Sequence, residues 1–336
     1  MALNGANGHD PLHDDDGLVV VDDADLQSYF AVHNGRRYHT TSSPYPLPLD
    51  RPEVQRFNTE HNILRVVMNG NLCVNPLRVV QALADDGRTT KTVVDLATGN
   101  GKWMRDMAEL FPHVEFYGVD IVPLAPTYYA QNVYFELEDI RTPTRWQEGT
   151  VDVVHARSAF MAVNDYRRII QEAARILKPE GLFLAGEWQQ NIALHPDTPI
   201  PPALQASYLP NLRRFFSTLH TALGRRNIIS TVTMNIEGYA NAYTRFFYTP
   251  VHGERFFVPI GTWSASEEGR NMGHRMQGVL RRYMDSVRPL LLGEIPEAAV
   301  DQMFAACEAE MALPGSGLGM IFATFCAVRR TGIGPD

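Results

Sequence analysis

The sequence contains little lysine and no polybasic run. Only three of its 336 residues are lysine, the 38 Asp and Glu residues outnumber the 30 Lys and Arg residues, and the formal net charge is −8. Such an acidic chain lacks the electrostatic attraction to phosphate backbones that supplies non-specific nucleic-acid binding. The composition therefore argues against DNA or RNA as a partner.

The sequence also lacks the signs of a disulfide framework, a metal site or a membrane anchor. Its three cysteines, Cys73, Cys307 and Cys326, are odd in number and too widely spaced for a C-x-x-C pair. The first 35 residues carry seven Asp and no Lys or Arg, unlike a signal or transit peptide. The longest apolar stretches, such as 318–328, are shorter than the roughly 18 residues that cross a bilayer. We therefore expect a cytoplasmic protein with no metal ion and no membrane contact.

The chain begins with an acidic segment and continues into helical patterns. Residues 1–24 cannot bury enough apolar surface to offset their ordering entropy, which predicts a disordered tail. Asp50 as N-cap with Pro52 in the first turn predicts a helix, and a second helix starts at Pro76. The two helices predict an N-terminal helical cap over residues 25–90.

From residue 92, short apolar runs alternate with helical patterns. Strands are predicted at 92–96, 114–119, 133–136, 151–156 and 181–185, with helices at 102–111 and 165–177. Continuous apolar strands are typical of parallel sheets that are buried on both faces. The pattern predicts a doubly wound α/β core over residues 91–190.

The remaining sequence predicts a helical insertion and one more strand. Helices are expected at 203–223, 267–292 and 296–311, with an irregular aromatic segment at 239–263 and a strand at 319–329. We expect residues 191–318 to form a lid and helical insertion, and residues 319–336 to hold the last strand and the C-terminus.

The segment from Val93 to Gly101 runs from a strand through a glycine loop into a helix. Small residues let the backbone approach a ligand, and free N–H groups at a helix start can bind an anionic group. A tight turn without a ligand is the alternative. Polar motifs at 120, 138–140 and 152–157 end the next three strands, at the edge where open α/β sheets bind ligands.

Two nucleotide-binding motifs do not fit this loop. A dinucleotide-binding fingerprint has the form Gly-x-Gly-x-x-Gly or Ala. When it is aligned on Gly99 and Gly101, its last small residue falls at Met104, which is too large. A phosphate-binding loop needs Lys followed by Ser or Thr, but Trp103 follows Lys102. NAD and nucleoside triphosphates are therefore disfavoured as ligands.

Taken as a set, these motifs resemble class I S-adenosylmethionine-dependent methyltransferases, whose first motif is an acid followed by Gly-x-Gly-x-Gly. Asp95, Ala97, Gly99 and Gly101 match it, with Ala97 in place of the first glycine. Further matches to fungal methyltransferases related to the velvet-complex regulator of secondary metabolism occur over about residues 30–330: Tyr38, His39, His61 and the segments 45–50, 155–157 and 258–263.

The resemblance implies a mostly parallel, seven-stranded Rossmann-like sheet and S-adenosyl-L-methionine as the cofactor. It assigns cofactor contacts to residues at the strand ends: Asp95, Ala97, Thr98, Gly99 and Gly101 for the methionine part, Asp120 and Ile121 for the ribose, Asp139 and Ile140 for the adenine, and His155, Ala156 and Arg157 near the sulfonium. The substrate pocket is expected to involve Phe160, Met161, Trp188 and Trp263.

The sequence leaves open whether a general base is used. Phe160 and Met161 stand where many relatives of this fold carry a histidine, so His155, Glu187 and His195 are the candidates. Each also has a structural alternative, as a hydrogen-bonded wall residue, a capping or ion-pair partner, and a loop residue before Pro196. Methyl transfer to an ionised oxygen can proceed by positioning alone.

The sequence thus predicts a methyltransferase that acts on a small metabolite, with the oxygen of a carboxylate, enol or phenol as the acceptor. Two alternatives remain. The first is a regulatory protein that keeps the fold and acts through protein partners. The second is an enzyme, such as a pericyclase, that binds the cofactor but has lost methyl transfer. The oligomeric state is left open.

Overall fold

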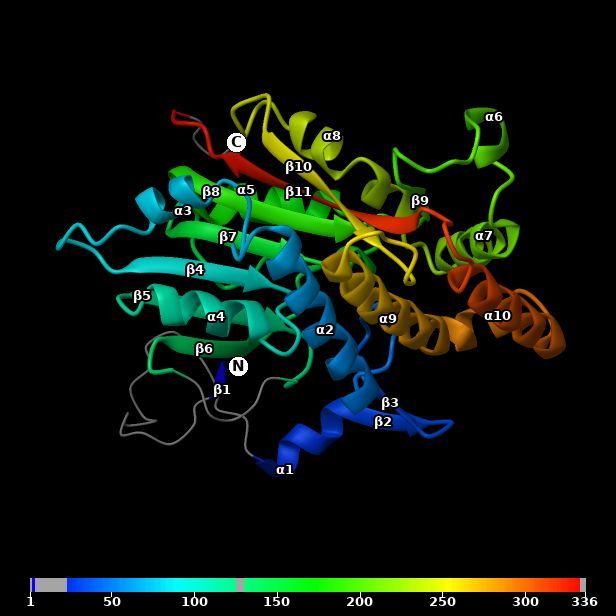
Figure 1. Ribbon diagram of the computed structural model, residues 1–336. Helices are drawn as coiled ribbons and strands as arrows, with labels where there is room; N and C mark the ends of the chain where they lie inside the picture. The colour runs from blue at the N-terminus through cyan, green and yellow to red at the C-terminus, as the bar shows by residue number, and fades with distance from the viewer. Residues whose placement is uncertain (1, 4–22, 125–129, 333–336) are drawn as a thin grey trace.

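The computed structural model describes residues 2–3, 23–124 and 130–332, and it contains a central nine-stranded sheet (Figure 1). The strands follow the order β1-β6-β5-β4-β7-β8-β11-β10, and β9 pairs with β11. Their bounds are β1 Ala2–Leu3, β4 Lys91–Leu96, β5 Val114–Asp120, β6 Val133–Leu137, β7 Val151–Arg157, β8 Leu177–Trp188, β9 Ala193–Leu194, β10 His252–Pro259 and β11 Leu318–Val328.

The order of the strands creates a switch point at the centre of the sheet. Strands β4 to β8 pair in parallel, whereas β11 runs antiparallel to both of its neighbours, β8 and β10. From β4 the chain proceeds outward through β5 and β6, then returns to the other side of β4 as β7. Ligands of open α/β sheets bind at such a point, beyond the carboxyl ends of the strands.

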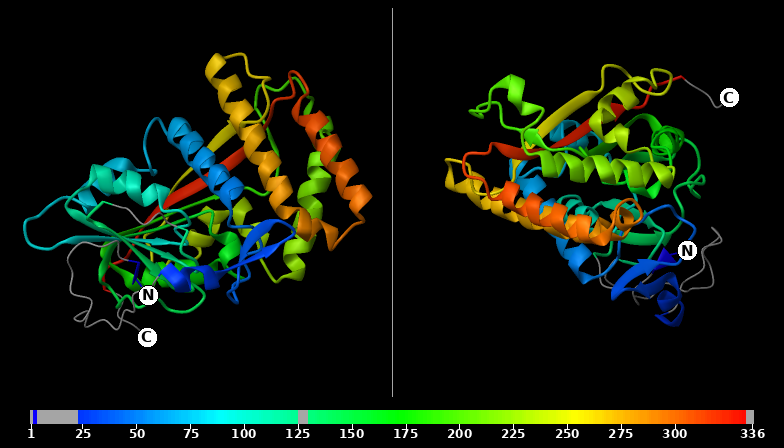
Figure 2. Two further views of the ribbon diagram at one scale, coloured as in Figure 1. Left: turned by 90° about the horizontal axis from the view of Figure 1, so that it is seen from below. Right: turned by 90° about the vertical axis from the view of Figure 1, so that its right-hand side faces the viewer.

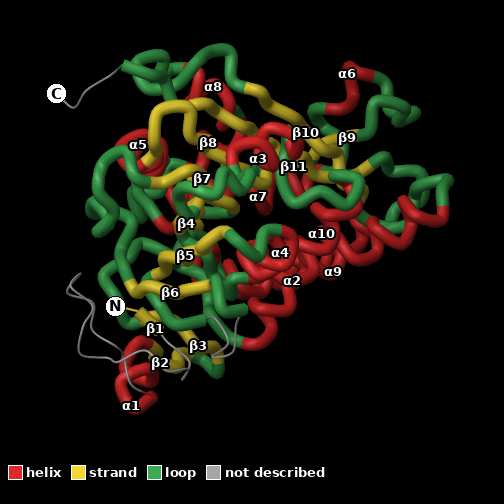
Figure 3. The backbone as a smooth tube through the Cα atoms, turned by 90° about the vertical axis from the view of Figure 1, so that its left-hand side faces the viewer, coloured by secondary structure: helices red, strands yellow, loops and turns green. Residues whose placement is uncertain are grey.

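Helices cover both faces of the sheet, which confirms the predicted doubly wound, mostly parallel architecture. Val93 and Val153 pack into a core with α3 (Pro76–Ala82) and α4 (Lys102–Leu110). Their neighbours Val94 and Val154 pack on the opposite side with α5 (Arg167–Ile176) and α7 (Pro210–Arg225). Figure 3 shows α4 and α5 on opposite sides of the strands. This alternation follows from the two-residue side-chain period of a strand.

The N-terminal cap contains a hairpin that the sequence analysis did not predict. The segment starts with α1 (Asp23–Leu26) and a 3-10 turn at Gln27–Tyr29, and β2 (Phe30–His33) then pairs with β3 (Arg36–His39). The predicted helix α2 (Arg51–Val67) follows, and Asp50 caps it by accepting a hydrogen bond from the Glu53 backbone N–H at 3.4 Å. Most of the predicted tail, residues 4–22, lies outside the described residues.

The insertion differs from its prediction in two places. The helix expected at 203–223 is divided into α6 (Pro202–Gln205) and α7, because Leu209 before Pro210 adopts a left-handed backbone with φ of 56°. Strand β10 replaces part of the expected irregular segment. Its first half is charged and exposed and it ends at a proline, as edge strands often do. Further elements here are the 3-10 turn Ser230–Met234, α8 (Ile236–Asn241), α9 (Glu267–Leu292) and α10 (Glu297–Met311).

Helix α9 packs against α2 of the cap and lies beside α10 (Figure 2). Near its start, Gly273 meets the loop after β10 at close range, where the Gly261 backbone N–H donates to the Gly273 carbonyl at 3.0 Å. A Cβ atom on Gly273 would stand 1.9 Å from the Gly261 carbonyl oxygen. Glycine at this position therefore fixes how closely α9 approaches the sheet.

We expect Gly273→Ala to lower the free energy of unfolding by about 1–3 kcal/mol, since overpacking must displace backbone. Gly278→Ala on the same helix is the matched control, because the nearest atom to its added Cβ is Arg282 Nη1 at 3.5 Å. Alanine there should stabilise the helix by up to about 1 kcal/mol. Urea unfolding of both variants measures the difference, and equal stabilities would contradict the close-contact argument.

Candidate functional site

The glycine loop between β4 and α4 has the backbone that its sequence requires. Gly99 and Gly101 have φ of 60° and 67°, in the left-handed region that glycine adopts without strain. Ala97 has φ of 57°, so the alanine that replaces the first glycine of the motif holds a conformation that glycine would favour. A Cβ atom on Gly99 would meet nothing within 4 Å. The loop is thus open on the side where a ligand would approach.

Asp120 at the end of β5 ties this loop to the neighbouring strand. Its Oδ2 accepts from the Gly99 N–H at 2.8 Å, and its Oδ1 accepts from the Ile121 N–H at 2.8 Å. Burial of this carboxylate raises its pKa to about 6, although the backbone donors act in the opposite direction. Asp120 is therefore a partly buried acid with a pKa raised to about 6.

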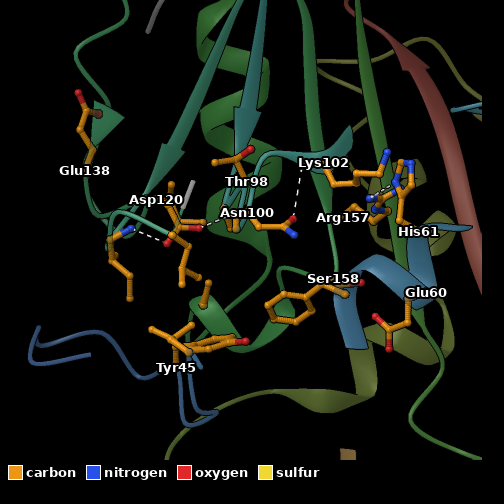
Figure 4. A pocket seen from close by; sticks show the side chains of 18 of the residues that line it. Tyr45, Glu60, His61, Thr98, Asn100, Lys102, Asp120, Glu138, Arg157 and Ser158 are labelled. Atoms are coloured by element: carbon orange, nitrogen blue, oxygen red, sulfur yellow. Dashed lines mark hydrogen bonds between the residues drawn. The ribbon is translucent and has the colours of Figure 1, made fainter. Parts of the chain in front are cut away.

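These residues border a cavity at the switch point, which we call the first cavity. It encloses about 950 Å³ between side chains, part of it open to solvent, and α2 and Tyr45 form its outer wall. Figure 4 shows Asp120 and Glu138 at one end and Lys102, His61 and Arg157 at the other. Its walls include seven of the predicted cofactor residues: Ala97, Thr98, Gly99, Asp120, Ile121, Ile140 and Arg157.

The other predicted cofactor residues lie outside the walls of the first cavity. Asp95 accepts from the Thr98 hydroxyl at 2.7 Å and lies 2.6 Å from His155 Nδ1, and the His155 ring stacks on Trp103. Ala156 is fully buried in β7, and Gly101 caps α4. The Asp139 carboxylate pairs with Arg141, and it is Glu138 that lines the cavity. Asp95 and His155 therefore support the loop from beneath.

A cationic group stands at one end of the first cavity. Arg157 Nη2 donates to His61 Nδ1 at 3.0 Å, and His61 Nε2 donates to Asp106 Oδ2 at 2.9 Å. Burial lowers the pKa of His61 to about 3, so this ring is neutral at neutral pH. Within the described part of the chain, the Arg157 guanidinium has no carboxylate within ion-pair distance. A partly buried guanidinium without an ion-pair partner among the described residues is suited to an anionic ligand group.

A second cavity of about 570 Å³ adjoins the first. The two share Tyr45, Phe57, Glu60 and Ser158. The walls of the second cavity include Glu187 and three of the four predicted substrate residues, Phe160, Met161 and Trp188. Residues from α9 complete the wall: Met276, Val279, Leu280 and Tyr283.

Trp263 and His195 lie elsewhere. The Trp263 indole donates to the Leu318 carbonyl at 2.7 Å, and its ring stands 5.6 Å from that of His195. Neither residue lines the first or the second cavity. The structure therefore places these two candidates together in a packing contact beside β11.

Glu187, at the end of β8, is fully buried in the wall of the second cavity. Its Oε1 accepts from the backbone N–H groups of Ala159 and Phe160 at 2.8 and 3.1 Å. Burial raises its pKa to about 8. The polar neighbour of the carboxylate in the wall is the buried Tyr166 hydroxyl, which acts to lower the pKa of Glu187, and Oε2 makes no other hydrogen bond to the described residues. Phe160 is one of the two positions where many relatives of this fold carry a histidine. Its backbone N–H instead binds the carboxylate of Glu187, which comes from the neighbouring strand β8.

Three charged side chains of α2 form a buried cluster between the cap and α9. Arg56 donates to Glu53 Oε1 at 2.9 Å through Nε and to Glu60 Oε1 at 2.6 Å through Nη1, while Ser286 of α9 donates to Glu53 Oε2 at 2.8 Å. Sequence analysis did not single out this cluster. Its i, i+3 and i+4 spacing was visible, but such spacing is equally typical of an exposed helix face.

The described residues do not meet the requirements of a metal site or of a membrane-spanning helix. They contain no group of three or more His, Cys, Asp or Glu side chains placed to hold a metal ion. They also contain no helix that is both long and apolar enough to span a bilayer.

Comparisons with known proteins identify relatives of this chain. Residues 88–206, from before β4 to beyond α6, match the family model described as a methyltransferase domain. The chain is 25% identical over 271 residues to the methyltransferase pytC of Aspergillus terreus, covering 80% of this chain and 76% of that protein. It is 32% identical over 149 residues to the secondary metabolism regulator laeA of Coprinopsis cinerea, which is 44% of this chain but only 36% of that protein.

A solved structure of similar fold is the phosphoethanolamine N-methyltransferase 2 of Haemonchus contortus, with 14% identity and a TM-score of 0.43 over 88% of this chain and 62% of that one. The family match and the curated relatives confirm the predicted resemblance and, with it, the predicted class of cofactor.

Proposed function

We propose that this chain is an S-adenosylmethionine-dependent methyltransferase that methylates an oxygen atom of a small molecule in secondary metabolism. The observation that carries the proposal is the pair of adjoining cavities. One has charged groups of opposite sign at its two ends, and the other is largely apolar with a buried carboxylate in its wall.

The first cavity fits the cofactor in the charge and placement of its lining residues. Arg157 would bind the carboxylate of the methionine part, since it has no ion-pair partner among the described residues. Asp120 would accept hydrogen bonds from the ribose hydroxyls, and Ile140 with Glu138 would border the adenine. The open Gly99 would let the ligand approach the backbone.

The second cavity would hold the acceptor. When bound, the cofactor supplies an activated methyl group whose bond to a sulfonium breaks as the acceptor oxygen bonds to the carbon, leaving a neutral thioether. The proton of a hydroxyl acceptor needs a recipient, and Glu187 Oε2 is a buried oxygen in the cavity wall whose polar neighbour among the described residues is the Tyr166 hydroxyl. We assign Glu187 as the general base, held in place by the Ala159 and Phe160 N–H groups.

A regulatory role through protein partners is the second candidate, because part of the chain resembles relatives named as regulators of secondary metabolism. One experiment separates the candidates. The purified protein is incubated with methyl-labelled cofactor and an extract of the organism that makes it. A labelled small molecule supports the proposal. Label found only in protein supports the regulator, and cofactor binding without any labelled product supports an enzyme that has lost methyl transfer.

The raised pKa of Asp120 predicts a pH dependence of cofactor binding. Hydroxyl groups donate to the ionised carboxylate, so affinity for S-adenosylhomocysteine should rise as the pH increases from 5 to 7, with a midpoint near 6, and then level off. Asp120→Ala should weaken binding about 10-fold to 150-fold at pH 7 and abolish this dependence. Calorimetry measures both effects. Asp165→Ala, an acid outside both cavities, is the control, and unchanged binding by Asp120→Ala would refute the ribose assignment.

Glu187 predicts a second pH dependence, this time of the rate. A base must be ionised to accept a proton, so kcat should rise between pH 6.5 and about 8 and reach a plateau above the pKa of Glu187. Glu187→Gln should lower kcat about 10²-fold to 10⁴-fold and still bind S-adenosylhomocysteine. His195→Ala, outside the cavities, should leave the profile unchanged. A flat profile that Glu187→Gln does not alter would show that positioning alone suffices.

A further inference from the structure

We infer that the acceptor is a neutral, largely apolar molecule in which the reacting hydroxyl stands beside a carbonyl-type oxygen, and that the second cavity discriminates against carboxylic acids and amines. This inference rests on the proposed function, because it assigns the second cavity to the acceptor.

The first support is a pair of buried polar atoms in the cavity wall. Glu187 and Trp188 are adjacent in the chain, are 0% and 6% exposed, and both line the second cavity. The Trp188 indole N–H has no hydrogen-bond partner among the described residues, and Glu187 Oε2 has none apart from the neighbouring Tyr166 hydroxyl, which lowers the pKa of Glu187. Buried polar groups are rarely left unpaired in native proteins, so the indole N–H indicates a ligand that supplies its partner and also meets Glu187.

The chemistry of the two atoms limits that ligand. An indole N–H can only donate, so the ligand must offer an acceptor such as a carbonyl oxygen. An ionised Glu187 oxygen can only accept, so the ligand must also offer a donor such as a hydroxyl. A hydroxyl beside a carbonyl provides both groups. An ammonium group provides donors only, and a carboxylate provides acceptors only.

The second support is the charge of the cavity wall. Arg56 and Glu60 both line the second cavity, and Arg56 lies between Glu60 and Glu53. The cluster of two acids and one base carries one net negative charge. All three guanidinium nitrogens of Arg56 already donate to these acids, which leaves it no ion-pairing role toward a ligand. A carboxylate entering this cavity would therefore meet a negative wall.

The rest of the wall favours an apolar body for the ligand. Leu47, Met161, Met276, Leu280 and Met320 contribute apolar surface, and the Trp188 and Phe160 rings offer flat faces. Methionine side chains are flexible and polarizable and adapt to aromatic ligands.

One competing ligand must be separated by experiment. Below its pKa, Glu187 is protonated and could donate, together with the Trp188 N–H, to a carboxylate. Such a carboxylate would need no base for methylation. The negative charge of Glu60 opposes the binding of a carboxylate here. Comparing how strongly the protein binds matched neutral and anionic ligands therefore distinguishes a hydroxyketone-type ligand from a carboxylate.

The test uses affinity selection with mass spectrometry on the protein loaded with S-adenosylhomocysteine at pH 9, above the pKa of about 8 of Glu187, so that this carboxylate is ionised. The probes are three matched series on the same one- to three-ring frameworks: ortho-hydroxyaryl ketones, arylcarboxylic acids and arylmethylamines. We expect the hydroxyketones to be retained about tenfold more strongly than either other series, as one matched hydrogen bond or one repelled charge contributes on that scale.

Variants test the assigned atoms. Trp188→Phe keeps a ring but removes the N–H and should weaken hydroxyketone retention about tenfold. Trp146→Phe is the matched control, because its buried indole N–H is also unpartnered among the described residues but lies outside both cavities. Glu60→Gln should increase the retention of the acids by removing the opposing charge.

Three outcomes would overturn the inference: equal or stronger retention of the acids or amines, no effect of Trp188→Phe, or no retention of any series by the loaded protein. The loading step itself tests the proposed function separately. If S-adenosylhomocysteine does not bind, the proposed function fails. If it binds and the ranking is reversed, only the acceptor assignment fails.

Discussion

The site depends on one kind of interaction that occurs twice, namely a carboxylate at the end of a strand held by backbone N–H groups of a neighbouring loop. Asp120 is held by Gly99 and Ile121, and Glu187 by Ala159 and Phe160. In each case the carboxylate fixes the loop that follows an adjacent strand. The parallel order of the sheet brings these ends to one edge, so both cavities are consequences of the same arrangement.

Burial makes the ionised form of both carboxylates less favourable than it is in water. It raises the pKa of Asp120 to about 6 and that of Glu187 to about 8, so ionising either acid costs more free energy in the folded protein. In a protein selected for stability alone, such acids would be exposed or paired with a base. Unfavourable burial of ionisable groups is common where a ligand later supplies the missing partner.

The sequence predicted correctly those elements whose formation depends on neighbouring residues in the chain. The five parallel strands, α2, α9 and the glycine loop lie where apolar runs, the Asp50 cap and small residues indicated. Strands β10 and β3 were missed because their sequences carry charged residues, and β2 because it is only four residues long; pairing with a neighbouring strand makes each of them a strand. At the site, the Arg157–His61 contact joins residues 96 positions apart, which no spacing rule could reveal. Trp263 was placed in the pocket from its aromatic context, whereas the structure packs it beside His195.

The two cavities are lined largely by different structural elements, and α2, Tyr45 and Ser158 border both. The first is built from the loops of the central strands and from α2, and α2 also borders the second. A change on the inner face of α2, at Phe57 or Glu60, must therefore alter both sites together. The contribution of α9 reaches only the second cavity, and its approach to the sheet is set at Gly273. On the proposed assignment of the two cavities, changes in α9 would alter the acceptor cavity and leave the lining of the cofactor cavity unchanged.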